Sequence, residues 1–138
     1  MKTKLGYWAA TGLFSLMMLG SAFAYLSGAP QMQEAFHHLG YPDYFRTMLG
    51  VAKVLGAVAL VAPRVPRVVR EWAYAGFGIT TVAAAISHAA SGDPMGKVLM
   101  PLVALALLAT SRVLLSAARE AGAGVARSEH GTALPVAG

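Results

Sequence analysis

The chain has 138 residues, of which 57% are hydrophobic and only 12% are charged, and its net charge is +5. Ordinary soluble domains carry about 25% charged residues, so this composition indicates a membrane protein, with length enough for one domain. The absence of cysteine excludes disulfides, thiolate nucleophiles and thiolate metal sites. The basic residues lie between apolar runs and form no single patch, which argues against nucleic acid as a partner.

The first apolar run covers residues 5–26 and follows Lys2 and Lys4. It is long enough to cross a bilayer, which takes about 20 apolar residues. A cleaved signal peptide is the alternative interpretation, because the start is basic and residues 22–24 (Ala-Phe-Ala) resemble a cleavage site. We expect the run to be retained as a span, since it is long for the apolar segment of a signal peptide.

Three further apolar runs are predicted to be spans, at residues 44–62, 71–90 and 98–116. A loop with several Gly and Pro residues precedes the first of these runs, and short turns separate the others. The expected fold is therefore all-α: a four-helix transmembrane bundle with up-down-up-down topology, formed by residues 1–116. Residues 117–138 are rich in Ala and Gly, and we expect them to form a flexible cytoplasmic tail.

The positions of Lys and Arg in the short connections predict the orientation of the bundle. One side carries most of them: Lys2, Lys4, Arg64, Arg67, Arg70, Arg112, Arg119 and Arg127. The other side has Lys97 and, near the mouth of the second span, Arg46. We therefore expect both termini to face the cytoplasm and the protein to lie in the bacterial inner membrane.

Polar residues occur at regular spacing inside two of the predicted spans. Lys53 is at the middle of the second span, and Arg46 precedes it by one heptad, about 10 Å along nearly the same helix face. Tyr74, Thr81 and His88 have the same spacing on the third span. If the two stripes face each other, Arg46 meets His88 and Lys53 meets Thr81.

Small residues accompany these stripes. Gly50 and Gly56 flank Lys53, and Gly76 and Gly78 are expected to lie across from them on the third span. Small residues allow membrane helices to approach closely, so we expect tight packing between the second and third spans.

Two interpretations of Lys53 remain open, because a charge inside a membrane is costly and calls for a partner or a function. In the first, Lys53 forms an ion pair with Glu71 that locks the helices together. In the second, Lys53 lines a wet cavity that would suit an anionic or carbonyl-bearing ligand. The candidate cavity residues are Arg46, Lys53, Thr81, His88, Tyr74 and, from the middle of the first span, Ser15.

Motifs for catalysis or metal binding are missing from the sequence. There is no nucleophile elbow, no phosphate-binding Gly-Lys loop and no carboxylate pair, so we predict no catalytic residues. Glu34 and His37 have the Glu-x-x-His spacing of di-iron bundles, but such sites need two of these motifs and two further glutamates. We therefore predict no metal site, and no cofactor follows from the residues alone.

Five segments, in this order along the chain, resemble a known family: residues 7–13, 38–45, 49–57, 70–77 and 87–88. In their order and spacing they resemble the DoxX-like family of small four-span integral membrane proteins. The resemblance covers nearly everything except the tail. It implies that the first span is retained, because the family pattern begins inside it.

The resemblance implies two competing functions, since most members of the family have no assigned activity. Relatives in the broader superfamily are linked to quinone-coupled sulfur oxidation or membrane redox assemblies, and an animal relative assists receptor assembly. The first function is a non-enzymatic protein of the lipid bilayer that binds or assembles with a membrane partner, or with itself. The second is a quinone-binding accessory subunit of a membrane redox system, with the quinone near Lys53, Arg46 and His88.

Overall fold

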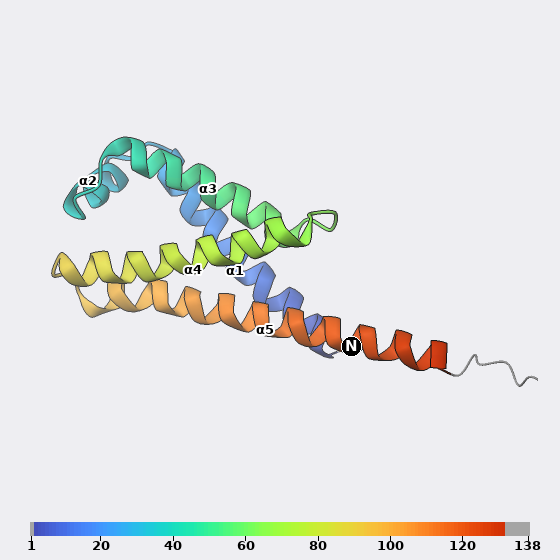
Figure 1. Ribbon diagram of the computed structural model, residues 1–138. Coiled ribbons are helices and arrows are strands. Elements are labelled where there is room, and N and C mark those ends of the chain that lie inside the picture. The colour runs from blue at the N-terminus through green and yellow to red at the C-terminus, as the bar shows by residue number, and fades with distance from the viewer. Residues whose placement is uncertain (1, 132–138) are drawn as a thin grey trace, which may run out of the picture.

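The computed structural model describes residues 2–131, and this part of the chain is helical with no strand. Figure 1 shows its five helices. They are α1 (Lys2–Leu26), α2 (Pro30–His38), α3 (Asp43–Val61), α4 (Arg67–Ala90) and α5 (Met95–Gly131). The all-α prediction is confirmed, and the short helix α2 lies in the loop between the first two predicted spans.

The four long helices pack against one another in pairs (Figure 1). Helix α1 contacts α3 and α5, while α4 also contacts α5 and α3, and α2 rests on α3. The start of α1 lies beside the C-terminal half of α5, because a Cβ added to Gly6 would lie 3.3 Å from Leu114 Cδ1. The α2 segment lies at the opposite end of the molecule.

Glycines in the left-handed region mark three of the turns. Gly28, Gly40 and Gly92 have φ angles of 71°, 81° and 70°. Residues with a Cβ rarely adopt such angles, so these positions favour glycine at helix ends. The turns before α2 and before α3 therefore each contain a glycine whose backbone conformation would be strained for any larger residue.

Aromatic and aliphatic side chains from α1, α3, α4 and α5 form one buried core. Phe14 and Leu60 are fully buried, and the Phe14 ring meets the Phe77 ring edge-on with their centroids 5.0 Å apart. Edge-to-face pairs of this kind add about 0.5–1.5 kcal/mol beyond the burial of their area. This contact connects α1 to α4 at the centre of the molecule.

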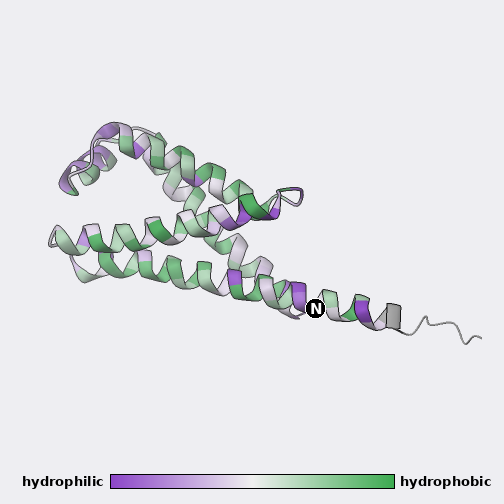
Figure 2. Cartoon of the chain, viewed as in Figure 1, coloured by the Kyte–Doolittle hydropathy of each residue, from purple (hydrophilic) through white to green (hydrophobic). Residues whose placement is uncertain are grey.

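Large apolar side chains also cover the outside of the helices. Leu16, Phe23, Leu55 and Ile79 all expose more than half of their surface, and Figure 2 shows hydrophilic residues gathered at α2, at the turn between α3 and α4, and along the last part of α5. Soluble monomers rarely expose apolar surface on this scale. The exposed apolar residues thus indicate a lipid-facing surface.

Three of the helices, within Lys2–Leu26, Asp43–Val61 and Met95–Ser128, are long and apolar enough to cross a membrane. Helix α4 contains the predicted span 71–90 but does not reach that level of apolarity in the part of the chain that the structure describes. Its polar stripe explains the difference, since Tyr74, Thr81 and His88 interrupt the apolar sequence.

The glycines beside Lys53 lie at close helix contacts, whereas those of α4 do not. A Cβ at Gly50 would lie 2.9 Å from Leu26 Cγ, and one at Gly56 would lie 2.7 Å from Phe77 Cε2. At Gly76 and Gly78 a Cβ would meet nothing within 4 Å. The expectation of close packing is therefore confirmed for α3, but the two α4 glycines do not take part in it.

Helix α5 is longer at both ends than the predicted span 98–116. It begins at Met95, which places Pro101 in its second turn, where proline removes a helical hydrogen bond to the carbonyl of Lys97. It continues to Gly131, so residues 117–131 are helical where the sequence predicted an irregular tail. Alanine, arginine and glutamate in this stretch are strong helix formers, which explains the difference. The rest of that predicted tail, residues 132–138, lies outside the described residues.

Candidate functional site

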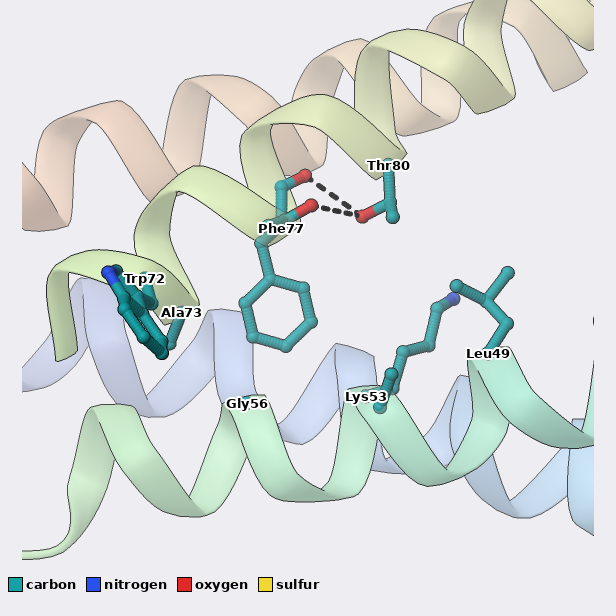
Figure 3. Close-up of a pocket in the computed structure, with 9 residues that line it drawn as sticks. Leu49, Lys53, Gly56, Trp72, Ala73, Phe77 and Thr80 are labelled. Atoms are coloured by element: carbon teal, nitrogen blue, oxygen red, sulfur yellow. Dashed lines mark hydrogen bonds between the residues drawn. The ribbon is translucent and has the colours of Figure 1, made fainter. Parts of the chain in front are cut away.

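The Lys53 ammonium lies between α3 and α1. Its Nζ donates a hydrogen bond to Ser21 Oγ at 2.6 Å and lies 4.2 Å from the centroid of the Tyr25 ring. Figure 3 shows the side chain running toward Leu49, the direction in which helical side chains tilt. Among the described residues no carboxylate lies within ion-pair distance of Lys53. A hydroxyl and an aromatic face are its partners, and neither carries a compensating negative charge.

The predicted Lys53–Glu71 pair is not formed. Glu71 instead accepts a hydrogen bond from Arg112 Nε at 2.9 Å, and Arg119 Nη1 lies 3.5 Å from its second oxygen. Arg67, one turn earlier on α4, lies 3.9 Å from the same oxygen. The ion-pair lock therefore joins α4 to α5, because α5 continues as a helix far enough to bring two arginines beside Glu71.

The residues of the two polar stripes do not pair with one another as predicted. Arg46 is buried and its guanidinium donates to the backbone carbonyl of Tyr25 on α1, while His88 pairs with Asp93. The stripe of α3 thus faces α1. Close packing at Gly50, which would put a Cβ 2.9 Å from the Leu26 side chain, requires this orientation of α3.

A cavity of about 470 Å³, here called the lysine cavity, lies among α1, α3, α4 and α5 beside Lys53. Its lining includes the polar residues Ser21, Lys53, Thr81 and His88 together with Thr80, Lys97 and Tyr25, and methionines and alanines make up most of the remainder. A volume of 300–1,000 Å³ with a few polar groups in an apolar wall is typical of small-molecule sites. The second interpretation of Lys53, a cavity residue, therefore matches the geometry.

A second cavity of about 450 Å³, the α2 cavity, lies between α2 and α4. Phe36, Tyr41 and Phe45 line it, and so do residues that also line the lysine cavity: Tyr25, Leu49, Thr80, Ala84, His88 and Lys97. A smaller cavity of about 170 Å³ is bounded by Lys53, Gly56, Trp72 and Phe77, and Figure 3 shows the Phe77 ring extending from α4 toward Gly56. Lys53 therefore borders two cavities, and the larger one adjoins the α2 cavity.

The family model for the DoxX-like family matches residues 9–111. This chain belongs to the DoxX-like family. The matched residues contain α2, α3 and α4 completely, most of α1 and the first part of α5, and thus every residue that lines the lysine cavity. Family membership and the three apolar helices indicate a multi-pass membrane protein. No curated protein and no solved structure matches the chain.

An acidic residue of this DoxX-like chain contacts His88 and Lys97, which line both cavities. Asp93 follows α4 and its side chain is only 6% exposed. It accepts a hydrogen bond from His88 Nδ1 at 2.7 Å, and Lys97 Nζ and His38 Nε2 lie 3.2 and 3.3 Å from its other oxygen. The hydrogen bond from His88, aided by Lys97, holds the pKa of the Asp93 carboxyl below its usual range. Asp93 is therefore an ionised residue that contacts side chains of α2, α4 and α5.

Tyr74 and Ser15 lie apart from the cavities. The Tyr74 hydroxyl hydrogen-bonds to Ser111 Oγ at 2.7 Å, and Ser111 in turn bonds to Thr11 Oγ1 at 2.6 Å, all three residues being buried. Ser15 is buried one turn after Thr11, and its hydroxyl has no partner among the described residues. These groups connect α1, α4 and α5 within the core, away from the ligand-sized spaces.

Of the six candidate residues, the structure brings Lys53, Thr81 and His88 to one cavity and places Arg46, Tyr74 and Ser15 outside its lining. Sequence reasoning missed Ser21 and Asp93. Ser21 and Tyr25 are four residues apart on α1, which puts both on one helix face, and that spacing was the available signal. Asp93 lies in the turn after α4, and its contacts depend on how α2 and α5 pack. Among the described residues, no group of three His, Asp or Glu side chains is placed to hold a metal ion.

Proposed function

We propose that this DoxX-like protein is a non-enzymatic membrane protein that binds a lipid-soluble small molecule in the lysine cavity. The observation that carries the proposal is the Lys53 ammonium, which borders a cavity of about 470 Å³ without a carboxylate partner among the described residues. An ammonium in apolar surroundings favours a negatively charged or carbonyl oxygen. The ligand therefore carries such an oxygen on an otherwise apolar body.

A quinone has the required chemistry, with ring carbonyls to accept a hydrogen bond from Lys53 and an apolar remainder for the methionine-rich wall. The protein then acts as a quinone-binding accessory subunit of a membrane redox system. Thr80, Thr81 and His88 supply further polar groups to the same cavity.

The membrane arrangement belongs to the same proposal. We place all four long helices across the bilayer of the bacterial inner membrane as an up-down-up-down bundle, with both termini cytoplasmic. Support for α4 as a span comes from Trp72, Ile79 and Ile86, which are 73%, 71% and 62% exposed on its outer face. Support for the orientation comes from the arginines around Glu71, which lie at the end of the molecule where α1 begins.

Because the chain has no cysteine, single introduced cysteines at Lys2 and at Ala90 test the orientation. Only the cysteine at Ala90 should react with a membrane-impermeant reagent in intact cells.

Ligand binding is tested with protein purified in mild detergent. Native mass spectrometry with lipid extraction identifies a co-purified molecule, and titration with a short-tailed benzoquinone, followed by tryptophan fluorescence, measures affinity. Removal of a charged hydrogen-bond donor costs about 1.5–3 kcal/mol, so Lys53→Met should weaken binding about 10- to 100-fold. Lys4→Met, an exposed lysine on α1, is the matched control and should bind like the wild type. Equal affinity in Lys53→Met, or no binding by any of the three, would refute the proposal.

Assembly with a membrane partner, or with a second copy, is the second candidate function. Gly76 and Gly78 favour it, because a Cβ at either position would meet nothing within 4 Å and small residues on a helix surface allow another helix to approach closely. Replacement of both glycines by leucine should disrupt a complex seen by crosslinking in membranes. If the crosslinking pattern of that variant equals the wild-type pattern, neither glycine lies at the contact.

A further inference from the structure

Helix α2 is a short element with a left-handed glycine on either side of it. It covers Pro30–His38, and Gly28 and Gly40, with φ angles of 71° and 81°, precede and follow it. Phe36 is its only buried residue, and its ring packs edge-on against Tyr25 with the centroids 4.9 Å apart. Segments with so little buried apolar surface open at low free energy.

This helix covers the cavity that leads toward Lys53. Gln31, Met32, Ala35 and Phe36 of α2 form one wall of the α2 cavity. The residues shared by the α2 cavity and the lysine cavity, Ala84 among them, make the two spaces neighbours. A ligand that enters beneath α2 therefore has a route to the Lys53 ammonium through apolar surroundings.

Two contacts connect this segment to the opposite wall of the α2 cavity. His38, the last residue of α2, lies with Nε2 3.3 Å from Asp93 Oδ1. Tyr41, in the turn that follows, forms a hydrogen bond between its hydroxyl and Ser87 Oγ at 2.7 Å. Asp93 is itself held by His88, whereas α2 is joined to α1 through Gly28 and to α3 through the short turn that contains Gly40 and Tyr41.

From this geometry we infer that α2 is a lid over the route to Lys53, closed by the contacts of His38 with Asp93 and of Tyr41 with Ser87. The inference rests on the proposed function, because it names the regulation of the same ligand site. Opening moves α2 and the turn after it, as far as Tyr41, about Gly28 and the start of α3, and breaks both contacts. The lid sets how fast the ligand enters and leaves, whereas Lys53 sets how tightly it binds.

A cysteine reporter tests the lid without any ligand. Ala84→Cys places a single thiol where both cavities meet, in a chain that otherwise has no cysteine. Its rate of reaction with a water-soluble maleimide should rise about tenfold or more when His38→Gln and Tyr41→Phe are combined, since each contact contributes about 1 kcal/mol. His37→Gln is the matched control, because His37 is adjacent in sequence but contacts Asp43 and not Asp93.

A second reporter separates lid opening from general loosening. Ala90→Cys lies on an exposed position near the end of α4 and lines neither cavity, so its reaction rate should not change in any of these backgrounds. If Ala84→Cys reacts equally fast with and without the two contacts, α2 is not a lid. If both reporters accelerate together, the contacts are structural and the inference also fails.

Binding kinetics give a readout that distinguishes this inference from the proposed function. In stopped-flow mixing with the short-tailed benzoquinone, the His38→Gln, Tyr41→Phe double variant should raise the association and dissociation rates together and leave Kd nearly unchanged. Lys53→Met should instead raise Kd. If no quinone binds, the proposed ligand is wrong, and the thiol reporter still decides whether α2 opens. If Kd rises as much as the dissociation rate, α2 is part of the binding site and not a lid.

Discussion

Replacement of Gly56 by alanine tests the close contact between α3 and α4 beside Lys53. The added Cβ would lie 2.7 Å from Cε2 and 2.8 Å from Cζ of the Phe77 ring, well inside the ordinary carbon–carbon separation of about 3.5–4.0 Å. The ring cannot move away freely, because it is 5% exposed and packs edge-on against Phe14. Relief of the clash therefore requires a shift of α3 relative to α4.

The magnitude follows from two opposing contributions. Overpacking of this kind costs about 1–3 kcal/mol, while alanine in place of glycine in a helix interior gains up to about 1 kcal/mol. Gly76→Ala on α4 has only the second contribution, since its Cβ meets nothing within 4 Å. The difference between the two variants thus isolates the clash, and we expect Gly56→Ala to be less stable than Gly76→Ala by about 1–3 kcal/mol.

Unfolding by SDS in mixed micelles, followed by tryptophan fluorescence, measures both free energies. Phe77→Leu provides the rescue, because it removes the two ring atoms that the new Cβ would meet, and in that background Gly56→Ala should have the same effect as Gly76→Ala. Equal stability of Gly56→Ala and Gly76→Ala would show that the helices are not in contact at this position, and the small cavity beside Lys53 would be larger than the structure has it.

Three further predictions concern the polar contacts. Glu71→Gln should destabilise the protein by about 1–3 kcal/mol in the same assay. This cost lies between the values for exposed and buried ion pairs because the Glu71 side chain is 32% exposed. Glu120→Gln, on the exposed face of α5, should not destabilise the protein, and equal effects of the two variants would contradict the α4–α5 ion-pair lock. Asp93→Asn should lower Tm. Because the hydrogen bond from His88 lowers the pKa of the Asp93 carboxyl, the difference in Tm between the wild type and the variant should persist down to about pH 5 and shrink below about pH 4, as the pH falls past the usual carboxyl value. A difference in Tm that vanishes at neutral pH would refute this. Tyr74→Phe should cost about 1 kcal/mol through loss of its buried hydrogen bond, with benzoquinone affinity unchanged; a weakened affinity would place Tyr74 in the site.

Much of the fold was predictable because it depends on local sequence. The apolar runs overlap α1, α3, α4 and α5, since the length of an apolar segment and the turn residues around it largely determine where an apolar helix begins and ends. The position of Lys53 inside such a run likewise identified it as a residue of interest. The end of α5 was not predictable from hydropathy, because residues beyond the apolar run remain helical through their own propensity and through Arg119, which pairs with Glu71.

The partners of the polar residues were decided by the tertiary structure alone. Helical spacing determined which residues of one helix share a face, but not which neighbouring helix that face meets. Close packing at Gly50, where an added Cβ would lie 2.9 Å from the Leu26 side chain, accompanies an orientation of α3 toward α1, so Lys53 meets Ser21 and Arg46 meets a backbone carbonyl of α1. Glu71 then pairs with α5, and Lys53, without a carboxylate among its described neighbours, borders a cavity. The sequence by itself determined an apolar helical protein with a cation, Lys53, inside one of its apolar runs. The packing of the helices determined that Lys53 borders a ligand-sized space, because contacts between distant residues depend on how whole helices rotate against one another.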